Sequence, residues 1–536
     1  MEGKHENGGR DFSDALIAQG WTSHSSCLKY FYTRRTAVKM LRHNAGPART
    51  YGTITQSSSS AQSSDSMDPD LTKTGKAPAA QDVNHRDLEA TGTGQREGNA
   101  KFHQLGWKRL TILAMVEAIA LGSLGLPKAF ATLGMVAGIF LSIGIGLVAM
   151  HAAYNIGQIK LKYPQVSHYA DVGSLLFGPI GSSLFIGAFV SLLIFVVGSH
   201  CLTGAIAFKD IAQSKICSTA FSAISAAILL LLAIPPSFSD VAVLGYIDFA
   251  SIILAIGITM IATGLQDRGS LGDPEPYVPW SAWPKSGITF EEAIVSTNSI
   301  VFAYSFGGCL PSFMNDMHTP KDYVKTLWWL GGSQILIYTL TGSIIYAFVG
   351  QTVQSPALLS AGPLISRIVF GIALPVIFIS GSINTTVVCR YIHGKVFANS
   401  TIRYVNSPSG WATWLGLVFT VTMLAWIIAE AIPIFSDILS ISSSLFVSGL
   451  SYYIPPILWF VLLKKGAWYE RDNIKSSICN GGVFLIGIIV LGCGTYSSIA
   501  ELVSKQIIRQ QFRFTNEAVT QVREARAGLI GKPFNC

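Results

Sequence analysis

The chain has 536 residues, of which 50% are apolar and 13% are charged, and its formal net charge at pH 7 is +8. An average soluble protein carries about 25% charged residues, so this composition leaves too little charge to cover a soluble globule. It argues against a soluble enzyme, a disordered protein and a nucleic-acid binder, and the basic excess is also typical of a multi-pass membrane protein with basic cytoplasmic loops.

The first 106 residues are polar and rich in Ser, Thr and Gly, and they hold 13 basic and 11 acidic side chains. Such a segment buries too little apolar surface to fold by itself, so we expect a disordered cytoplasmic tail over 1–106. Long apolar runs fill residues 107–504, which we interpret as a transmembrane transporter domain. Residues 505–536 are again polar and are expected to form a C-terminal tail.

The apolar runs are long enough for helices that cross a bilayer, which takes about 20 residues each. Continuous apolar runs do not suit barrel strands, so the predicted fold is an all-α polytopic membrane protein. Eleven spans are expected, at 109–131, 135–158, 183–208, 217–235, 241–264, 290–315, 326–350, 362–389, 411–432, 435–463 and 479–503. With the N-terminus inside, the inner flanks of these spans hold 13 Lys and Arg and the outer flanks hold 6.

Two spans are interrupted by glycine and proline. The first reads EAIALGSLGLPKAF over 117–130, and the sixth reads SIVFAYSFGGCLPSFMNDM over 299–317. Gly weakens a helix and Pro removes a backbone donor, and irregular backbone at membrane depth is tolerated only beside protein or a water-filled cavity. Two broken helices five spans apart indicate a 5+5 inverted repeat with the substrate site at the breaks. Phe302, Tyr304 and Phe306 flank the second break and suit apolar or aromatic substrates.

Ionisable residues within the spans are few, and Glu117 is the strongest candidate for coupling to an ion. It lies about one turn before the Gly122 break, and a carboxylate that is neutralised by protonation suits a carrier driven by protons. The hydroxyl-rich SGSINTT stretch over 380–386 offers a competing ion site, with Ser382 and Thr385 as candidate sodium ligands, although such hydroxyls also bond back to their own helix. Asp248 in the fifth span is a weaker candidate than Glu117.

Four motifs resemble the amino acid/auxin permease family, and within it the fungal neutral amino acid permeases of the N-system type. They are EAIALGSLGLPKAFATLG (117–134), YADVGSLLFGPIG (169–181), FAYSFGGCLPSFMNDMHTPKDY (302–323) and AIPIFSDILSISSSLFVSGLSYYIPPILW (431–459). The resemblance covers roughly 107–504. It implies the inverted-repeat fold of leucine-transporter type, with eleven spans, and uptake of amino acids driven by protons or sodium.

The resemblance also implies which residues bind substrate. The contacts fall on Gly122, Ser123, Leu124 and Gly125 in the first span and on Phe302, Ala303, Tyr304 and Ser305 in the sixth. Sodium-coupled relatives carry Asn where this chain has Glu117, and this difference favours proton coupling.

The predicted function is therefore proton-coupled symport of neutral, aliphatic or aromatic, amino acids at the plasma membrane. The partners are a small-molecule substrate, protons and the lipid bilayer, with no nucleic acid, metal or cofactor. Sodium coupling, a place in the vacuolar membrane, and an amino acid sensor with little flux remain the alternatives. An enzyme is not expected, because the sequence holds no cluster of catalytic groups, no P-loop and no HExxH motif.

Overall fold

The computed structural model describes residues 106–214, 216–236, 241–266, 279–315, 317–397, 400, 402, 405 and 407–527. The expected disordered tail lies outside this range except for its last residue. By its internal contacts the chain forms two units. One comprises Gln95–Trp468 and Asn480–Cys536, and in the other the described residues are Tyr469–Cys479, which form a turn and the first turns of the last helix.

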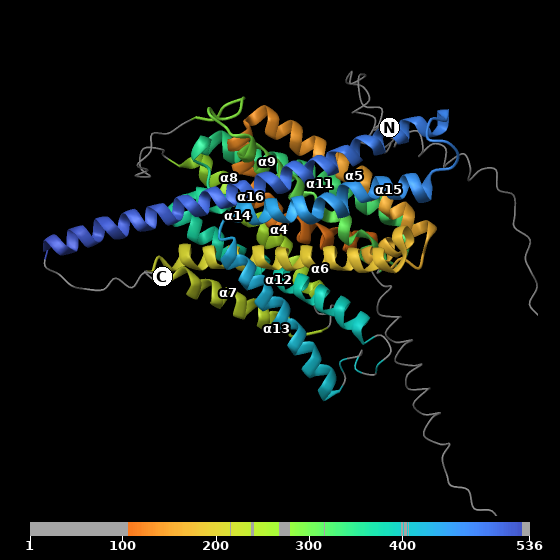
Figure 1. The fold of residues 1–536 in the computed structure, drawn as a ribbon, viewed down its shortest axis with the longest axis horizontal. Coiled ribbons are helices and arrows are strands. Elements are labelled where there is room, and N and C mark those ends of the chain that lie inside the picture. Colours follow the sequence, from red (N-terminus) through yellow and green to blue (C-terminus); the bar gives the residue numbers. More distant parts are fainter. Residues whose placement is uncertain are drawn as a thin grey trace, which may run out of the picture. The chain divides into compact units, whose positions relative to one another are not determined.

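The described residues form helices and no β-strand, as predicted from the apolar runs (Figure 1). The α-helices are α4 (Trp107–Leu133), α5 (Met135–Lys162), α6 (Tyr169–Ala212), α7 (Ser218–Leu232), α8 (Val241–Leu265), α9 (Phe290–Ala303), α10 (Leu310–Asn315), α11 (Tyr323–Val349), α12 (Pro363–Val396), α13 (Pro408–Ala431), α14 (Phe435–Ser442), α15 (Ile454–Leu458) and α16 (Arg471–Ala527). Short 3-10 helices are η1 (Ser305–Cys309), η2 (Pro320–Asp322), η3 (Gly350–Thr352) and η4 (Ala357–Ala361), and π-helices are η6 (Ser443–Tyr453) and η7 (Trp459–Leu463).

Eight of these helical stretches are long and apolar enough to cross a membrane, and two bent helix pairs raise the number to ten. The fourth predicted span is the shorter apolar helix α7, which has 15 residues. Every predicted span thus coincides with a helix, while the count of eleven crossings and the inverted repeat stay predictions. Helix α6 begins at Tyr169, before the predicted start at 183, and has a kink at Gly178–Pro179, where Gly178 has a φ of 64°.

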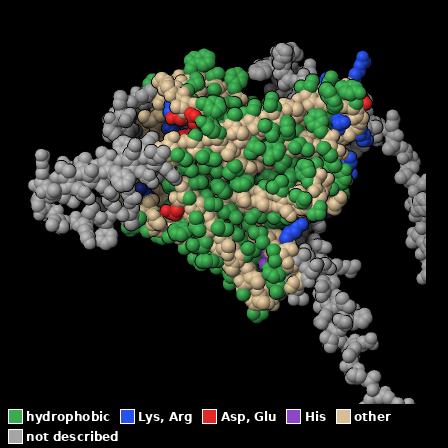
Figure 2. Space-filling model, in the orientation of Figure 1, with side chains coloured by type: hydrophobic (Ala, Val, Ile, Leu, Met, Phe, Trp, Pro, Cys, Tyr) green, Lys and Arg blue, Asp and Glu red, His purple; other side chains and the backbone are tan. Residues whose placement is uncertain are grey.

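The surface fits a lipid environment. Apolar side chains cover most of the face in Figure 2, and charged side chains lie toward its margins. Large apolar side chains in the middle of the helices are exposed on this surface. Examples are Phe140 on α5 (74% exposed) and Leu485 on α16 (58% exposed). In water such side chains would form a large apolar patch that promotes aggregation, whereas lipid tails solvate them without cost.

Helix α4 is central to the packing that positions the site. It contacts α11, α9, α8 and α12, and its label lies among theirs in Figure 1. The contact with α9 brings the first interrupted segment beside the second. Helix α14 packs against α9, and η6 packs against both α9 and η1, so the second interrupted segment also contacts the tenth predicted span.

Candidate functional site

The helix of the sixth predicted span is interrupted at the predicted position. Its first half, α9, begins with Thr289 as a side-chain cap, since Thr289 Oγ1 accepts a hydrogen bond from the Glu292 N–H at 3.2 Å. It ends at Ala303, and the chain continues as the 3-10 helix η1 into α10, with a bend of 41° between the halves. Pro311 has no N–H with which to continue the ladder, and the Leu310 N–H turns back to Gly307 O.

Carbonyl groups at this break accept hydrogen bonds from side chains of other helices. Ser451 Oγ donates to Ser305 O at 3.2 Å, and Tyr338 Oη donates to Ala303 O at 3.2 Å. Both donors are buried or nearly so, in η6 and α11. A backbone carbonyl without a partner at membrane depth is costly, so these contacts stabilise the irregular segment.

The first interrupted span is bent but keeps a helical backbone. Trp107–Ala120 and Gly122–Leu133 meet at 46°, so the bend lies where the glycines predicted a break. Helical geometry nevertheless continues through Gly122 and Gly125, and Pro127 lies within the helix. Ala118 O at this bend accepts from Tyr338 Oη at 2.6 Å. The same hydroxyl group therefore reaches a carbonyl of both interrupted segments.

Gly122 lies directly against the second break. A Cβ atom added at Gly122 would be 2.9 Å from Ala303 Cα and 3.0 Å from Tyr338 Oη, a distance that side chains do not tolerate without movement. Space at Gly125 is also limited, since an added Cβ atom would lie 3.1 Å from Leu439 Cδ1. Gly122 and Ala303, predicted substrate residues of the two spans, are thus brought together, and the short distance leaves no room for a side chain at Gly122.

The other predicted substrate residues are placed as follows. Ser123 is buried and donates to Ile119 O of its own helix at 2.8 Å, and Leu124 is buried. Tyr304 is buried, and its hydroxyl group lies 3.3 Å from Ser142 Oγ on α5. Ser305 is half-buried at the start of η1. No ligand contact tests their predicted role, which stays a prediction.

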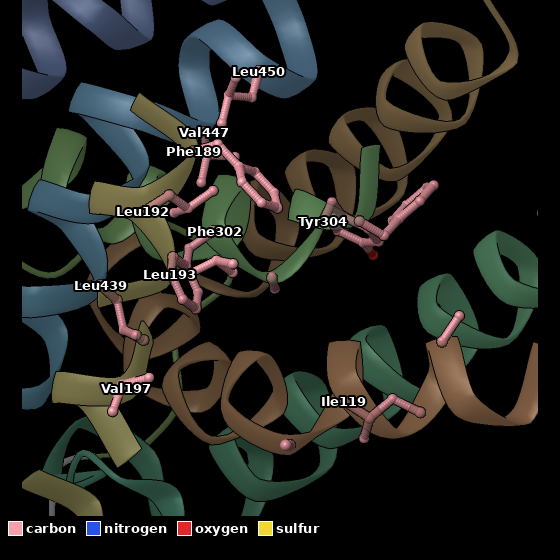
Figure 3. Close-up of a cluster of buried hydrophobic side chains, with 14 of the residues drawn as sticks. Ile119, Phe189, Leu192, Leu193, Val197, Phe302, Tyr304, Leu439, Val447 and Leu450 are labelled. Carbon is pink, nitrogen blue, oxygen red and sulfur yellow. The ribbon is translucent and has the colours of Figure 1, made fainter. Parts of the chain in front are cut away.

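An apolar wall adjoins Phe302. In Figure 3 Phe302 is drawn next to Leu192 and Leu193 of α6, while Val447 of η6 is drawn next to Phe189. All these groups are buried in the hydrophobic core. The wall comprises Phe302, Phe189, Leu192, Leu193, Leu439 and Val447. Sequence reasoning missed its members on α6, α14 and η6, because an apolar residue in one membrane span resembles every other apolar residue there.

Glu117 of α4 is held by α12. Its Oε1 accepts a hydrogen bond from Asn384 Nδ2, which also contacts Ser380 O at 3.0 Å. The side chain of Glu117 is half-buried, and it lies one turn before the bend. The candidate coupling residue therefore contacts the hydroxyl-rich stretch of α12, and Asn384 is the member of that stretch that reaches it.

The two candidate sodium ligands bond within their own helix. Ser382 Oγ donates to Ile379 O at 2.8 Å, and Thr385 Oγ1 donates to Gly381 O at 3.1 Å. Both side chains are buried. The hydroxyl hydrogen of each residue is taken up by its hydrogen bond within α12, while the lone pairs of each hydroxyl oxygen remain available to a cation. The described residues contain no group of three or more His, Cys, Asp or Glu side chains that would hold a metal ion.

Comparison with known proteins places these features in a family context. A family model described as "Transmembrane amino acid transporter protein" matches residues 103–500. The chain is 54% identical over 412 residues to the "N amino acid transport system protein" of Neurospora crassa, covering 76% of this chain and 87% of that protein. It is 24% identical over 443 residues to a "Transmembrane transporter" of Gibberella moniliformis, covering 81% and 88% of the two chains. It is 22% identical over 383 residues to "Amino acid transporter AVT1E" of Arabidopsis thaliana, covering 69% and 68%.

Proposed function

The chain belongs to the transmembrane amino acid transporter family, and from this we propose that it is a proton-coupled symporter of neutral amino acids in the plasma membrane. Its apolar helices and its family make it a multi-pass membrane protein that transports amino acids. The coupling ion, the neutral substrate class and the choice of membrane are the proposed part. The observation that carries the proposal is the Glu117 carboxyl group, held by Asn384 beside the bend of α4.

The two interrupted segments provide complementary groups for a zwitterion. The first N–H groups of a helix lack partners within it and favour an anion, so the turn after the α9 break suits an α-carboxylate. Carbonyl oxygens near Ala118 and Ala303 favour an ammonium group, in place of the Tyr338 hydroxyl contact that they make here. A free amino acid carries both charges, so these backbone groups can bind it without a dedicated Arg or Asp side chain.

Neutral substrates fit the lining beside Phe302. The apolar wall offers no charged partner for a substrate side chain, and placing a charge against it would cost several kcal/mol. This supports aliphatic and aromatic amino acids over acidic or basic ones.

The proposed mechanism is alternating access. Amino acid and proton bind beside the two breaks, and the helices that carry the breaks then move against the rest so that the site opens to the other side. Neutralising Glu117 by protonation removes the cost of moving a carboxylate through an apolar site. The proton thus acts by changing the charge of Glu117, which belongs to α4 and is hydrogen-bonded to Asn384 of α12.

Uptake into proteoliposomes tests the proposal. The protein is purified, reconstituted and given an inward pH gradient, an inward sodium gradient, or neither, with a panel of radiolabelled amino acids. Accumulation of neutral amino acids with the pH gradient alone is expected. Accumulation with sodium alone would contradict proton coupling and favour the Ser382 and Thr385 site. Saturable binding without any flux would instead favour a sensor.

The Glu117→Gln variant isolates the coupling residue. Gln keeps the shape and can still contact Asn384, but it cannot bind and release a proton. We expect accumulation driven by the pH gradient to be lost, while exchange of internal for external amino acid at equal pH partly survives. Concentrative uptake by this variant at the wild-type level would overturn the assignment of Glu117.

A further inference from the structure

A second carboxyl group, that of Asp248 on α8, lies inside the helices. Its residue is 0% exposed. Ser380 Oγ donates to Asp248 Oδ2 at 3.0 Å, whereas the buried Oδ1 has no hydrogen-bond partner among the residues that the structure describes. Within that same part of the chain, no salt bridge joins Asp248 to a Lys, Arg or His.

The ionised form of such a group is unfavourable. A buried carboxylate needs a cation or several donors to replace the water it loses, and one hydroxyl donor does not suffice. At membrane depth the penalty persists unless the group faces water or a partner. Burial without a counter-charge therefore favours the neutral, protonated form of Asp248 in this conformation.

One turn of α12 joins Asp248 to Glu117. Ser380 and Asn384 are four residues apart and so lie on one helix face. Ser380 Oγ donates to Asp248, Asn384 Nδ2 donates to Glu117, and Asn384 Nδ2 also contacts Ser380 O. Helices α4, α8 and α12 all pack against one another, so the two carboxyl groups flank one polar turn of α12.

The titratable surroundings of Asp248 are few. Helix α8 packs against α4, α11, α12 and η4, and η4 carries no titratable side chain. Glu117 is the titratable group of α4 that acts electrostatically on Asp248. The nearest titratable residue of α12 to Ser380 along the chain is Cys389, about 13 Å of helix away. On α11, Tyr338 donates to backbone carbonyls of α4 and α9.

We propose that Asp248 is a second proton-binding site of the transport cycle, so that two protons accompany each amino acid, one on Glu117 and one on Asp248. This rests on the proton coupling proposed above. Each proton binds a carboxylate oxygen on the acidic side and leaves to water on the other side, so only O–H bonds form and break. Repulsion between two neighbouring carboxylates favours binding of the first proton, and burial of the carboxylate that remains favours binding of the second.

The equilibrium accumulation ratio counts these protons. In proteoliposomes with the membrane potential clamped at zero, each proton carried down a gradient of one pH unit supports about tenfold accumulation of a zwitterion. The inference therefore predicts about 100-fold accumulation by the wild type and about tenfold by Asp248→Asn. Asp210→Asn is the matched control, because Asp210 on α6 also accepts from a serine of α12, Ser366 Oγ at 2.7 Å, but is only half-buried. It should keep the wild-type ratio.

The outcomes separate this inference from the proposed function. A wild-type ratio of about tenfold that Asp248→Asn leaves unchanged would overturn the second proton while leaving proton coupling intact. A wild type that ignores the pH gradient would overturn both. Exchange at equal pH shows whether Asp248→Asn is folded. If Asp248→Asn shows no exchange, Asp248→Glu replaces it in the test, because this variant keeps a carboxyl group. It must retain an accumulation ratio above about tenfold, or the inference is wrong.

Discussion

Gly122 lies against Ala303 where the two interrupted segments meet: a Cβ atom at Gly122 would lie 2.9 Å from Ala303 Cα. These residues are far apart in the chain and belong to different predicted spans, yet their backbones touch. Because Tyr338 lies at the same point, the contact links α4, α9 and α11. Any movement of one segment must therefore be felt by the other.

The first prediction concerns this contact. We expect Gly122→Ala to abolish uptake, because the added methyl group forces the segments apart, and overpacking of this kind costs about 1–3 kcal/mol. Gly144→Ala on α5 is the control, since nothing lies within 4 Å of its added Cβ atom. Radiolabelled uptake at matched membrane levels measures both. Normal uptake by Gly122→Ala would show that the close approach is not needed for transport.

The second prediction concerns the hydroxyl group that both segments share. Tyr338→Phe keeps the ring but leaves Ala118 O and Ala303 O without this donor. Loss of a buried hydrogen bond costs about 0.5–1.5 kcal/mol, so we expect a lower Tm and a reduced rate of uptake. Tyr323→Phe, on the same helix but bonded to Tyr154 O, should lower the Tm without the same change in KM for substrate. Equal effects of the two variants on KM would contradict a role for Tyr338 at the breaks.

The third prediction concerns the apolar wall. Phe302→Leu enlarges the space beside the break, so transport should shift toward larger neutral side chains. One methylene in an apolar pocket is worth roughly 10–200-fold in selectivity, and a change of at least about tenfold in the ratio of kcat/KM for phenylalanine to that for alanine is expected. Phe185→Leu, a buried α6 residue that stacks on Tyr169, is the control. An unchanged ratio in Phe302→Leu would place the substrate elsewhere.

The fourth prediction concerns pH and stability. His168, which precedes α6, lies near Ser312 Oγ with its Nδ1 at 3.1 Å. Burial lowers the pKa of His168 below its ordinary value of 6.5, with Asp171 opposing this effect and Lys395 and Lys160 adding to it. The unfolded chain then binds a proton that the folded chain does not, so stability falls as the pH falls below 6.5.

The matched variant for this prediction is His168→Asn. Asn is accepted well at the start of a helix but has no titratable ring. The Tm of the variant should therefore decline less than that of the wild type as the pH falls from 7 to below 6.5. Thermal unfolding of the purified protein at a series of pH values measures the difference. If the Tm of the wild type and of His168→Asn fell in parallel with pH, His168 would not be a source of acid sensitivity.

Sequence reasoning was strongest where local chemistry decides the structure. Continuous apolar runs predicted the helical class, and Gly307, Gly308 and Pro311 predicted the interruption after α9, because neither residue type sustains a helix. It was weaker at α4, which bends at the glycines but stays helical even though Pro127 follows Gly125 by two residues. The kinked start of α6 at Tyr169 was missed, since the Gly178–Pro179 pair is typical of a turn between two helices rather than of one continuous helix.

Tertiary relationships lay beyond the sequence. Glu117 was singled out by its position, but its partner Asn384 is 267 residues away and was only one of several polar residues in its stretch. Nothing in the local sequence distinguishes Phe189 or Leu439 from other apolar residues, so the apolar wall required the packing of α14 against both α9 and α6. Tyr338 likewise sits in an ordinary apolar run, and its hydroxyl partners come from two other helices.

The central claim is that protons move with the amino acid through a site that includes Glu117. Proton movement during uptake tests it most directly, in proteoliposomes that contain a pH-sensitive dye and no sodium, at equal starting pH. Adding a neutral amino acid outside should acidify the lumen in the wild type and leave the lumen pH unchanged in Glu117→Gln. Uptake by the wild type without any change in lumen pH would contradict the account.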